Sequence, residues 1–307
     1  MEKIAIVILH FLGKDLTYQC LHSIEQLECK NLKLEVMIVN TNPRENLRDL
    51  ANRFKKFIFL DTKKNLGFTG GNNFGIRKAL ENKSDFVFIL NNDTVVDKNF
   101  LIELLKTADS DKKIGILGSK IYFAPGCEFH QERYQKKDQG KVIWYAGGLI
   151  DWSNVVSSHR GVDEVDHGQY DSPGETDFVS GCAMLVKKEV FQKIGLFDEK
   201  YFLYWEDVDL CQRAKIAGFM VIFVPQAKIW HVNAGSSEIG GKLHDYYMTR
   251  NRLLFGFKYA LLKTKMALLK ESLKKAVGGR YWQKIGIRDF YFKKFGQGSF
   301  QTHEMIK

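Results

Sequence analysis

Three carboxylates lie close together in the segment 204–209, which reads YWEDVD. A helical pattern follows this segment, and acidic side chains are favoured in a first helical turn because they face unpaired backbone N–H groups. Helix capping therefore accounts well for Asp209. Glu206 and Asp207 are adjacent and stand beside Trp205, so they repel each other and resist desolvation, which is how proteins tune the pKa of a general base. This pair is a candidate general base, with helix capping as the alternative.

A second candidate site follows the apolar run 85–90, where Asn91, Asn92 and Asp93 close a predicted strand. A carboxylate flanked by amides offers the oxygen ligands that suit Mg²⁺ or Mn²⁺ carrying a diphosphate. The alternative is a turn that caps the next helix. His231 also follows an apolar strand. It would act as a second metal ligand only if the fold places it opposite Asp93, and a lone histidine is otherwise a packing or capping residue.

Glycines gather between a predicted strand and a predicted helix in the segment 65–73, which reads NLGFTGGNN. The segment starts at Asn65. In it, the amides of Gly67, Gly70 and Gly71 could approach a phosphate or a ribose near a helix N-terminus. The spacing is not GxGxxG and the lysine of a P-loop is missing, so neither a dinucleotide site nor a P-loop is indicated. A tight strand-to-helix turn is the alternative.

The elements that must position these residues alternate regularly over the first ninety residues. Apolar runs at 3–9, 34–39, 56–60 and 85–90 predict strands, and helical spacing lies between them, with helices expected at 44–54 and up to residue 80. Alternation of this kind predicts an α/β fold with a doubly wound, mainly parallel sheet. Ligands of such sheets bind at the carboxyl ends of the strands, where Asn40, 65–73 and 91–93 fall.

The second half of the chain is predicted to add more strands and helices to this sheet. The expected segments are a helix at 101–108, strands at 114–121, 144–151, 177–186 and 219–224, and a helix after Asp207. A length of 307 residues with a 45% hydrophobic share is enough for one large α/β domain and an appendage. We divide the chain into a domain at 1–241, with halves of about 1–125 and 140–241, and an extension at 242–307.

Cysteine usage and hydropathy bear on where the chain works. Five cysteines are odd in number and form no CxxC pair, which predicts reduced thiols in the cytoplasm. No apolar run reaches the length of about 18 residues that a membrane-spanning helix needs. These patterns predict neither a disulfide-stabilised secreted protein nor an integral membrane protein.

Positive charge is concentrated in the extension, where residues 242–294 hold 14 Lys and Arg against 3 acidic residues. A basic tail can serve nucleic acid, anionic lipid or solubility. Because the remaining chain is near neutral, nucleic acid is not predicted as a partner. One amphipathic helix over 253–277, with leucines on one side and lysines on the other, predicts contact with a membrane surface. The alternative is a helix packed on the catalytic domain with a solvated basic face.

Five segments occur in a fixed order along the chain. They are NLGFTGGNNFG (65–75), FVFILNNDT (86–94), FVSGCAMLVKKEVF (178–191), GLFDEKYFLYWEDVDLCQRAKIAG (195–218) and IWH (229–231). Together they resemble family 2 glycosyltransferases with a GT-A fold, and within that family they are most similar to the branch of rhamnosyltransferases and galactofuranosyltransferases of bacterial surface polysaccharides. The resemblance runs from residue 3 to about residue 252.

The resemblance implies roles for the two acidic sites. Asp93 matches the last acid of the family's DxD-type motif, which binds a divalent metal under the sugar-nucleotide diphosphate, and His231 matches the histidine that completes the metal site. Asp207 matches the catalytic base. Glu206 matches its acidic neighbour near the acceptor, and Trp205 is assigned to the acceptor with it.

Donor-binding roles follow in the same way. Asn40 stands where many members have an aspartate that reads the pyrimidine base, which leaves base selectivity open because an amide both donates and accepts. Asn91 replaces the first acid of the motif, so ribose contact would pass through an amide, with Asn92 beside it. The glycine segment 65–71 would lie beside the nucleotide. Arg250 is expected to meet the diphosphate of the donor or of a lipid acceptor.

The implied activity is an inverting transfer that uses Mg²⁺ or Mn²⁺ and needs no covalent enzyme intermediate. The resemblance favours L-rhamnose from dTDP-rhamnose as the donor sugar, and a glycan or a polyprenyl-diphosphate-linked glycan as the acceptor. UDP-galactofuranose, UDP-glucose or another UDP-sugar is the alternative donor. A non-catalytic nucleotide- or glycan-binding subunit is the alternative of another class. The expected location is cytoplasmic, at the inner face of the plasma membrane, and a homo-oligomer is compatible with it.

Overall fold

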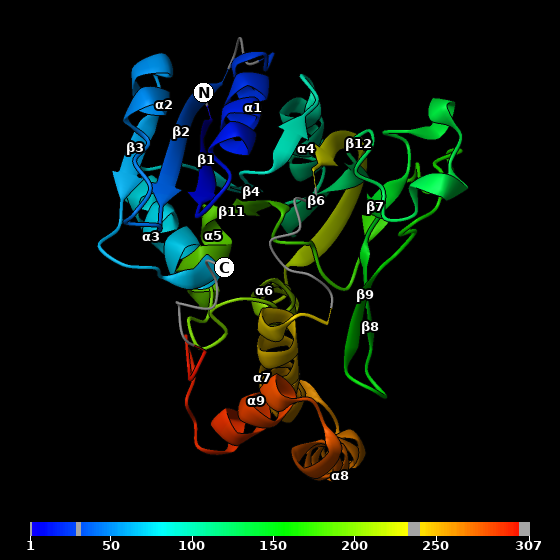
Figure 1. Cartoon of the computed structure of the whole chain (residues 1–307). Helices are drawn as coiled ribbons and strands as arrows, with labels where there is room; N and C mark the ends of the chain where they lie inside the picture. The colour runs from blue at the N-terminus through cyan, green and yellow to red at the C-terminus, as the bar shows by residue number, and fades with distance from the viewer. Residues whose placement is uncertain (1, 29–31, 233–239, 301–307) are drawn as a thin grey trace.

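The computed structural model describes residues 2–28, 32–232 and 240–300 (Figure 1). Its centre is a 10-stranded sheet in which eight strands run in the order β10-β12-β6-β11-β4-β1-β2-β3, with β5 paired to β12 and β7 paired to β6. The strands of this sheet are β1 (Lys3–His10), β2 (Lys33–Asn40), β3 (Ile58–Asp61), β4 (Phe86–Asn91), β5 (Thr94–Val96), β6 (Ile114–Phe123), β7 (Ile143–Tyr145), β10 (Gly174–Glu175), β11 (Ala183–Lys187) and β12 (Met220–His231). A hairpin of β8 (Gly148–Asp151) and β9 (Val156–His159) stands apart.

Helices flank the sheet and continue beyond it at the C-terminal end. They are α1 (Lys14–Glu25), α2 (Arg48–Arg53), α3 (Gly67–Glu81), α4 (Phe100–Ala108), α5 (Lys188–Ile194), α6 (Glu206–Ile216), α7 (Lys242–Tyr259), α8 (Leu262–Gly278) and α9 (Tyr281–Tyr291). Two short 3₁₀ turns, η1 (Gln131–Arg133) and η2 (Lys136–Asp138), lie in the segment between β6 and β7.

The predicted α/β architecture is confirmed. Strands β1, β2, β3 and β4 pair in parallel, and β12 pairs in parallel with β6. The apolar runs of β1 and β4 are buried apart from the half-buried Leu9, as expected for parallel strands that are covered on both faces. Strand β11 runs antiparallel between β4 and β6, so the sheet is mainly but not wholly parallel.

The parallel strands bring their polar carboxyl ends to one edge of the sheet. His10 at the end of β1 pairs with Asn40 of β2, which in turn pairs with Asp61 of β3. On the other side of β1, Leu9 pairs with Asn91 of β4. Residues scattered over the first ninety positions therefore meet along one line, which is where ligands of such sheets bind.

Several predicted segments differ from the structure. The glycine segment expected to be a loop forms the first turns of α3, which begins at Gly67. The strand expected at 177–186 starts only at Ala183, and the helix expected at 44–54 shortens to α2. The single amphipathic helix expected over 253–277 is broken between α7 and α8, where Ala260 and Leu261 adopt extended backbone angles. Helical spacing continues across the break, so periodicity alone could not locate it.

The C-terminal helices lie together at one end of the molecule, below the sheet in Figure 1. Leu253 and Phe255 of α7, Leu268 of α8 and Ile287 of α9 belong to the same buried cluster as the sheet. None of the described helices is long and apolar enough to cross a bilayer. Four cysteines are free thiols, and the fifth, Cys29, lies outside the described residues.

Candidate active site

Asp93 and His231 lie side by side although 138 positions separate them in the chain. The cause is the antiparallel pairing of β5 with β12, which sets His231 opposite Thr94, the residue after Asp93. Asp93 Oδ1 and His231 Nε2 are 3.1 Å apart, and the two side chains are only 15% and 8% exposed. Burial opposes ionisation of Asp93, but the imidazole and its hydrogen bond hold the pKa of this carboxyl below its usual value.

This pair has the donor atoms and the spacing that a divalent cation needs. Adjacent ligand atoms of an octahedral ion with bonds of about 2.1 Å are about 3 Å apart, which matches the observed separation. A nitrogen and a carboxylate oxygen together suit Mn²⁺ and related ions. Among the described residues no third His, Cys, Asp or Glu joins them. The remaining ligands of an ion here would therefore be substrate and water oxygens.

Aromatic side chains fix the other side of the His231 ring. Trp144 packs against His231 with ring centroids 4.8 Å apart, and His159 packs on Trp144 at 4.4 Å. His231 Nδ1 is buried without a hydrogen-bond partner among the described residues. Burial lowers the pKa of His159 to about 4, so this ring is neutral at physiological pH and brings no positive charge to the site. Trp144 and His159 sit in short strands without a motif, and sequence reasoning missed them.

Asp207 lies in the first turn of α6, where two backbone amides hold its carboxylate. Gly181 N donates to Asp207 Oδ2 at 2.9 Å, and Val208 N donates to Asp207 Oδ1 at 2.8 Å. Gly181 permits this approach, because a Cβ at that position would lie 2.9 Å from the ring of Phe68 and 3.5 Å from Asp207 Cβ. Helix capping and a poised carboxylate, which we weighed as alternatives, are thus compatible at the same residue.

The neighbouring carboxylate, Glu206, is in a different environment. It is 4% exposed, and its Oε2 has no hydrogen-bond partner among the described residues. Burial and the charge of Asp207 raise the pKa of Glu206 well above its usual value. Burial also raises the pKa of Asp207, and the amides of Gly181 and Val208 oppose that rise. Of the two groups, Asp207 is therefore the one that ionises first.

The two acidic sites are joined through the residues just before β11. Gly181 donates to Asp207, and the carbonyl of the next residue, Cys182, accepts a hydrogen bond of 2.9 Å from the backbone N–H of Asn91. Asn91 ends β4, two residues before Asp93. The structure thus brings Asp93, His231 and Asp207 to one region at the carboxyl edge of the sheet. The spacing of these residues in the sequence could not predict that they lie close together.

A strained loop aims the two carboxylates of α6. Phe202, Tyr204 and Trp205 have positive φ angles of 66°, 65° and 73°, a region that costs energy for residues with a side chain. Such a conformation persists only where its surroundings hold it. The position of Glu206 and Asp207 therefore depends on the groups that hold this loop.

Asn251 of α7 is the side chain that holds it. Its Nδ2 lies 2.9, 2.7 and 2.9 Å from the carbonyl oxygens of Tyr201, Leu203 and Tyr204. Asn251 is completely buried. The two N–H groups of one amide on a packed helix are thus shared among three carbonyls of the loop, and Arg250 also donates to the carbonyl of Tyr201.

The structure corrects the expectation for Arg250. Its guanidinium is completely buried and donates to Asn251, to the hydroxyl of Tyr246 and to four backbone carbonyls, so no donor is left for a diphosphate. The carbonyls belong to residues 200, 201, 294 and 296. Arg250 therefore joins the C-terminal segment to the strained loop.

Trp205, expected near the acceptor, is 3% exposed and packs on Phe255 of α7 with ring centroids 5.0 Å apart. An acceptor sugar cannot stack on a ring that is covered in this way. The structure gives Trp205 a packing role under the loop, so its assignment to the acceptor was wrong. Glu206 is also enclosed, and only Asp207 of this group is partly accessible.

The amides expected near the donor lie at the strand ends but are largely engaged. Asn40 is 3% exposed and donates to Asp61 Oδ1 and to the carbonyl of Glu45, both at 2.9 Å. Asn92 donates to the carbonyl of Leu12 at 2.9 Å and so anchors the loop after β1. Asn91, like Asn92, is half-buried at the end of β4. A base contact made by Asn40 would require it to exchange one of these partners.

The glycines of α3 serve close packing on the sheet. A Cβ on Gly71 would lie 2.3 Å from Leu9 Cδ1, and one on Gly67, where φ is +68°, would lie 2.5 Å from the ring of Phe202. A Cβ on Gly70 would meet Leu66 of the same turn at 2.9 Å. Asn65 Oδ1 accepts the Gly67 amide at 2.8 Å. These glycines let α3 reach both the strand ends and the strained loop.

Comparison with known proteins places this architecture in a family. Residues 3–245 match the family described as glycosyltransferase like family 2, which is most of the chain. The chain belongs to glycosyltransferase family 2. The resemblance that the five segments suggested is thereby confirmed.

Several curated glycosyltransferases are similar to this chain in sequence. A low-salt glycan biosynthesis hexosyltransferase, Agl10, of Haloferax volcanii is 24% identical over 59% of this chain and 61% of its own length. The dTDP-rhamnosyl transferase RfbF of Shigella flexneri is 22% identical over 74% of this chain and 72% of its own. An N-acetylglucosaminyl-diphospho-decaprenol L-rhamnosyltransferase of Mycobacterium tuberculosis is 43% identical over 60 residues, 20% of each chain.

Solved structures of other glycosyltransferases share the fold. GalNAc-T7 with UDP, GalNAc and Mn²⁺ superposes with a TM-score of 0.66 at 14% identity, covering 94% of this chain and 54% of that one. The mannosyltransferase PcManGT of Pyrobaculum calidifontis, in complex with GDP-Man and Mn²⁺, has a TM-score of 0.54 at 11% identity, covering 98% and 76%. At these identities the likeness shows the fold, which is GT-A, as the resemblance implied.

Proposed function

We propose that this family 2 chain transfers L-rhamnose from dTDP-rhamnose, with inversion, to a glycan or to a polyprenyl-diphosphate-linked glycan. The observation that carries this is the placement of the Asp93–His231 pair and of Asp207 on either side of the segment 181–182. Curated relatives named as rhamnosyltransferases support the choice of sugar, and the decaprenol named for one of them supports the acceptor.

The proposed chemistry assigns one task to each acidic site. Asp207 takes the proton from an acceptor hydroxyl as that oxygen attacks the anomeric carbon, and a single displacement inverts the configuration there. The amides of Gly181 and Val208 keep this carboxylate ionised and pointed in one direction. Burial and the charge of Asp207 raise the pKa of Glu206, which favours its protonated form and limits the negative charge beside the base.

Asp93 and His231 are the residues that would hold a divalent cation. A bound Mg²⁺ or Mn²⁺ supplies Lewis-acid stabilisation for the leaving diphosphate. Solved GT-A neighbours crystallised with Mn²⁺ support metal use of this kind. Trp144 fixes the ring plane of His231, so the ligand direction does not depend on the metal.

Selection of the donor base is assigned to Asn40 at the end of β2. Asn40 replaces an aspartate at the end of β2 and is bound to Asp61, so selection between thymine and uracil would depend on how this pair rearranges. UDP-galactofuranose and UDP-glucose remain the alternative donors. A non-catalytic binding subunit is disfavoured, because it has no need for a metal pair and a buried carboxylate held by two amides.

Thermal unfolding with Mn²⁺ and each of dTDP, UDP and GDP tests this proposal. A ligand at 100 times its dissociation constant stabilises the folded state by about 2.7 kcal/mol, which raises Tm by several degrees. We expect a metal-dependent rise that is larger with dTDP than with UDP, and we expect Asp93→Ala to abolish it. A rise with UDP alone would move the proposal to the galactosyl or glucosyl donor. No rise with any nucleotide would contradict the nucleotide-sugar function itself.

A further inference from the structure

The inner face of α8 is fixed to the helices beside it. Leu268 is 2% exposed and sits where a Cβ on Gly256 of α7 would be, 2.3 Å from Leu268 Cδ1. Ser272 and Tyr291 of α9 share a hydrogen bond of 2.7 Å between their hydroxyls. These contacts determine which face of α8 packs against α7 and α9.

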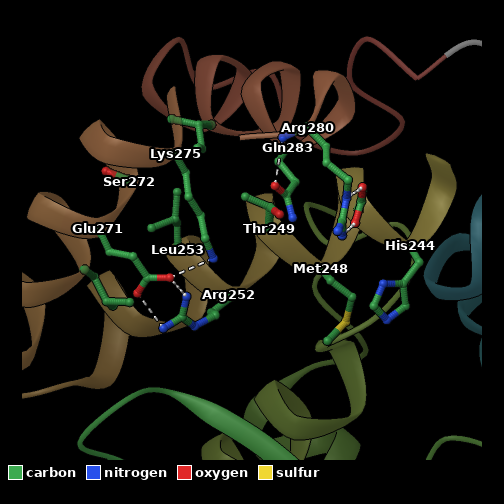
Figure 2. Close-up of a pocket in the computed structure, with 13 residues that line it drawn as sticks. His244, Met248, Thr249, Arg252, Leu253, Glu271, Ser272, Lys275, Arg280 and Gln283 are labelled. Carbon is green, nitrogen blue, oxygen red and sulfur yellow. Dashed lines mark hydrogen bonds and ion pairs between the residues drawn. The ribbon is translucent and has the colours of Figure 1, made fainter. Parts of the chain in front are cut away.

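Charged pairs around a cavity of about 190 Å³ stabilise the same orientation of α8 (Figure 2). Glu271 of α8 receives two hydrogen bonds from Arg252, at 2.8 and 2.9 Å, and pairs with Lys275 at 2.7 Å. The hydrogen bond from Arg252 is the main cause that lowers the pKa of Glu271 to about 2. Arg280 pairs with Asp245 across the same cavity. The charges that line the cavity are thus largely neutralised within it.

The opposite face of α8 carries an uncovered apolar stripe. Leu262, Met266, Leu273 and Val277 are 75%, 57%, 58% and 81% exposed. Their spacing of four, seven and four residues places them on one side of a helix, and the half-buried Leu269 lies in the same row. Side chains of this size are not left in water in a continuous row without a cause.

A row of lysines runs beside the stripe. Lys263, Lys270 and Lys274 are exposed and each lies one position beyond a member of the stripe, which puts them on one flank of it. Among the described residues none of the three forms an ion pair with a carboxylate, whereas Lys275 on the inner face does. The only acidic residue of α8, Glu271, points inward to Arg252.

We propose that this face of α8, defined by the five residues of the stripe and the three lysines beside it, docks on an anionic lipid surface. An apolar row flanked by unpaired lysines matches the acyl boundary and the anionic headgroups of a bilayer. A second copy of the chain is a poorer partner. A two-fold interface would pair the face with itself, and the face offers no carboxylate to the facing lysines. The docking is argued from α8 alone, and its meaning for catalysis rests on the proposed function. A lipid-linked acceptor would be held at the membrane surface on which α8 docks.

Vesicle co-sedimentation of the full chain tests the inference without any transfer reaction. The probes are vesicles of phosphatidylcholine alone and of phosphatidylcholine mixed with phosphatidylglycerol. We expect binding to the anionic vesicles that weakens with salt, and we expect a Met266→Gln, Leu273→Gln double variant to bind at least about tenfold more weakly. Because both side chains are exposed, this variant should keep the Tm of the wild type.

Matched controls separate this face from general stickiness or charge. Ile216→Gln removes an apolar side chain that is 67% exposed on α6, and a Lys136→Gln, Lys137→Gln, Lys141→Gln triple variant removes three lysines elsewhere. We expect the α6 variant to bind as the wild type does, and the remote triple variant to bind more tightly than a Lys263→Gln, Lys270→Gln, Lys274→Gln variant. Equal losses in the controls would overturn the inference, as would absence of binding to anionic vesicles. A dimer in light scattering that the double variant dissociates, without vesicle binding, would assign the face to a second copy instead.

Discussion

Glu206 and Asp207 are neighbours in the chain, but only one is equipped to stay ionised. Asp207 accepts hydrogen bonds from Gly181 and Val208, whereas Glu206 Oε2 has no partner among the described residues. Hydrogen bonds to a carboxylate favour its charged form, and burial without them disfavours it. Of the two side chains, Asp207 is therefore expected to carry the negative charge more readily, and Glu206 to keep its proton longer as the pH rises.

The first prediction concerns turnover. Asp207→Asn should keep nucleotide affinity and lose turnover by roughly 10²–10⁴, the usual size of a general-base contribution. Glu206→Gln is the matched control, because it makes the same change one position away and leaves the ionised group in place. Steady-state rates of nucleoside diphosphate release measure both. A larger loss for Glu206→Gln than for Asp207→Asn would reverse the assignment of the base.

The second prediction concerns stability and pH. The folded state raises the pKa of Glu206, so it binds a proton more readily than the unfolded chain. Stability from this group is fully present below the unfolded pKa, near 4.5, and is lost as pH rises above it. Glu206→Gln should therefore unfold at a higher Tm than the wild type at pH 7 to 8. The two Tm values should converge near pH 4, and a constant difference across this range would contradict the raised pKa.

At the scale of elements, α7 supports the site from behind. Its Asn251 binds three carbonyls of the loop that leads into α6, and its Phe255 covers Trp205. Neither contact was predicted, because nothing in the order of residues places α7 next to a loop fifty positions earlier. The sequence did identify the short motifs, since residue type and strand ends are local properties. Asp93 and His231 met only through the pairing of β5 with β12.

The third prediction tests this support. Asn251→Leu removes the donor and leaves three carbonyls of a strained loop without it, a cost of about 1–3 kcal/mol for an unsatisfied buried group. We expect turnover to fall by more than tenfold with little change in nucleotide affinity, because the loop positions the base and not the donor site. Arg252→Met, one residue away on α7, breaks an ion pair with α8 and should spare turnover. If Asn251→Leu and Arg252→Met had the same turnover, Asn251 would stabilise the fold without positioning the base.

The fourth prediction concerns the packing of α3. A Cβ on Gly75 would lie 2.4 Å from Val7 Cγ1 and 3.0 Å from Val39 Cγ2, so Gly75→Ala must push the helix away from the sheet. Overpacking of this kind costs about 1–3 kcal/mol. Gly278→Ala at the end of α8 meets nothing within 4 Å and is the matched control. Thermal unfolding should show a lower Tm for the first variant only, and an unchanged Tm there would contradict the tight contact.

At the scale of the whole molecule, the sheet and the C-terminal helices share one buried cluster. We predicted a boundary at residue 242 because the residues beyond it are strongly basic. Charged side chains lie mostly on the surface, so their distribution does not show which segments share a core. Asp209 of α6 illustrates the point, since Lys258 and Tyr259 of α7 bind it at 2.7 and 2.8 Å. The lysines of the basic tail thus have different surroundings. Lys258 of α7 binds Asp209, whereas Lys263, Lys270 and Lys274 form the exposed row on α8.

The fifth prediction follows from this shared core. A chain that ends at residue 241 loses the cover of Trp205 and two partners of Asp209, Lys258 and Tyr259, so it should unfold without a cooperative calorimetric transition. A chain that ends at Phe300 keeps every described contact and serves as the control. A cooperative transition in the shorter chain, at the Tm of the control, would show two independent domains instead.

In the proposed rhamnosyl transfer, Asp207 activates the acceptor hydroxyl. The most direct measurement incubates the protein with Mn²⁺, dTDP-rhamnose and an N-acetylglucosaminyl-diphospho-polyprenol, and follows the glycolipid by mass spectrometry and its new linkage by NMR. We expect a rhamnosylated lipid with inverted anomeric configuration, and a rate that falls strongly in Asp207→Asn but not in Glu206→Gln. Retained configuration, or full activity in Asp207→Asn, would contradict this proposal.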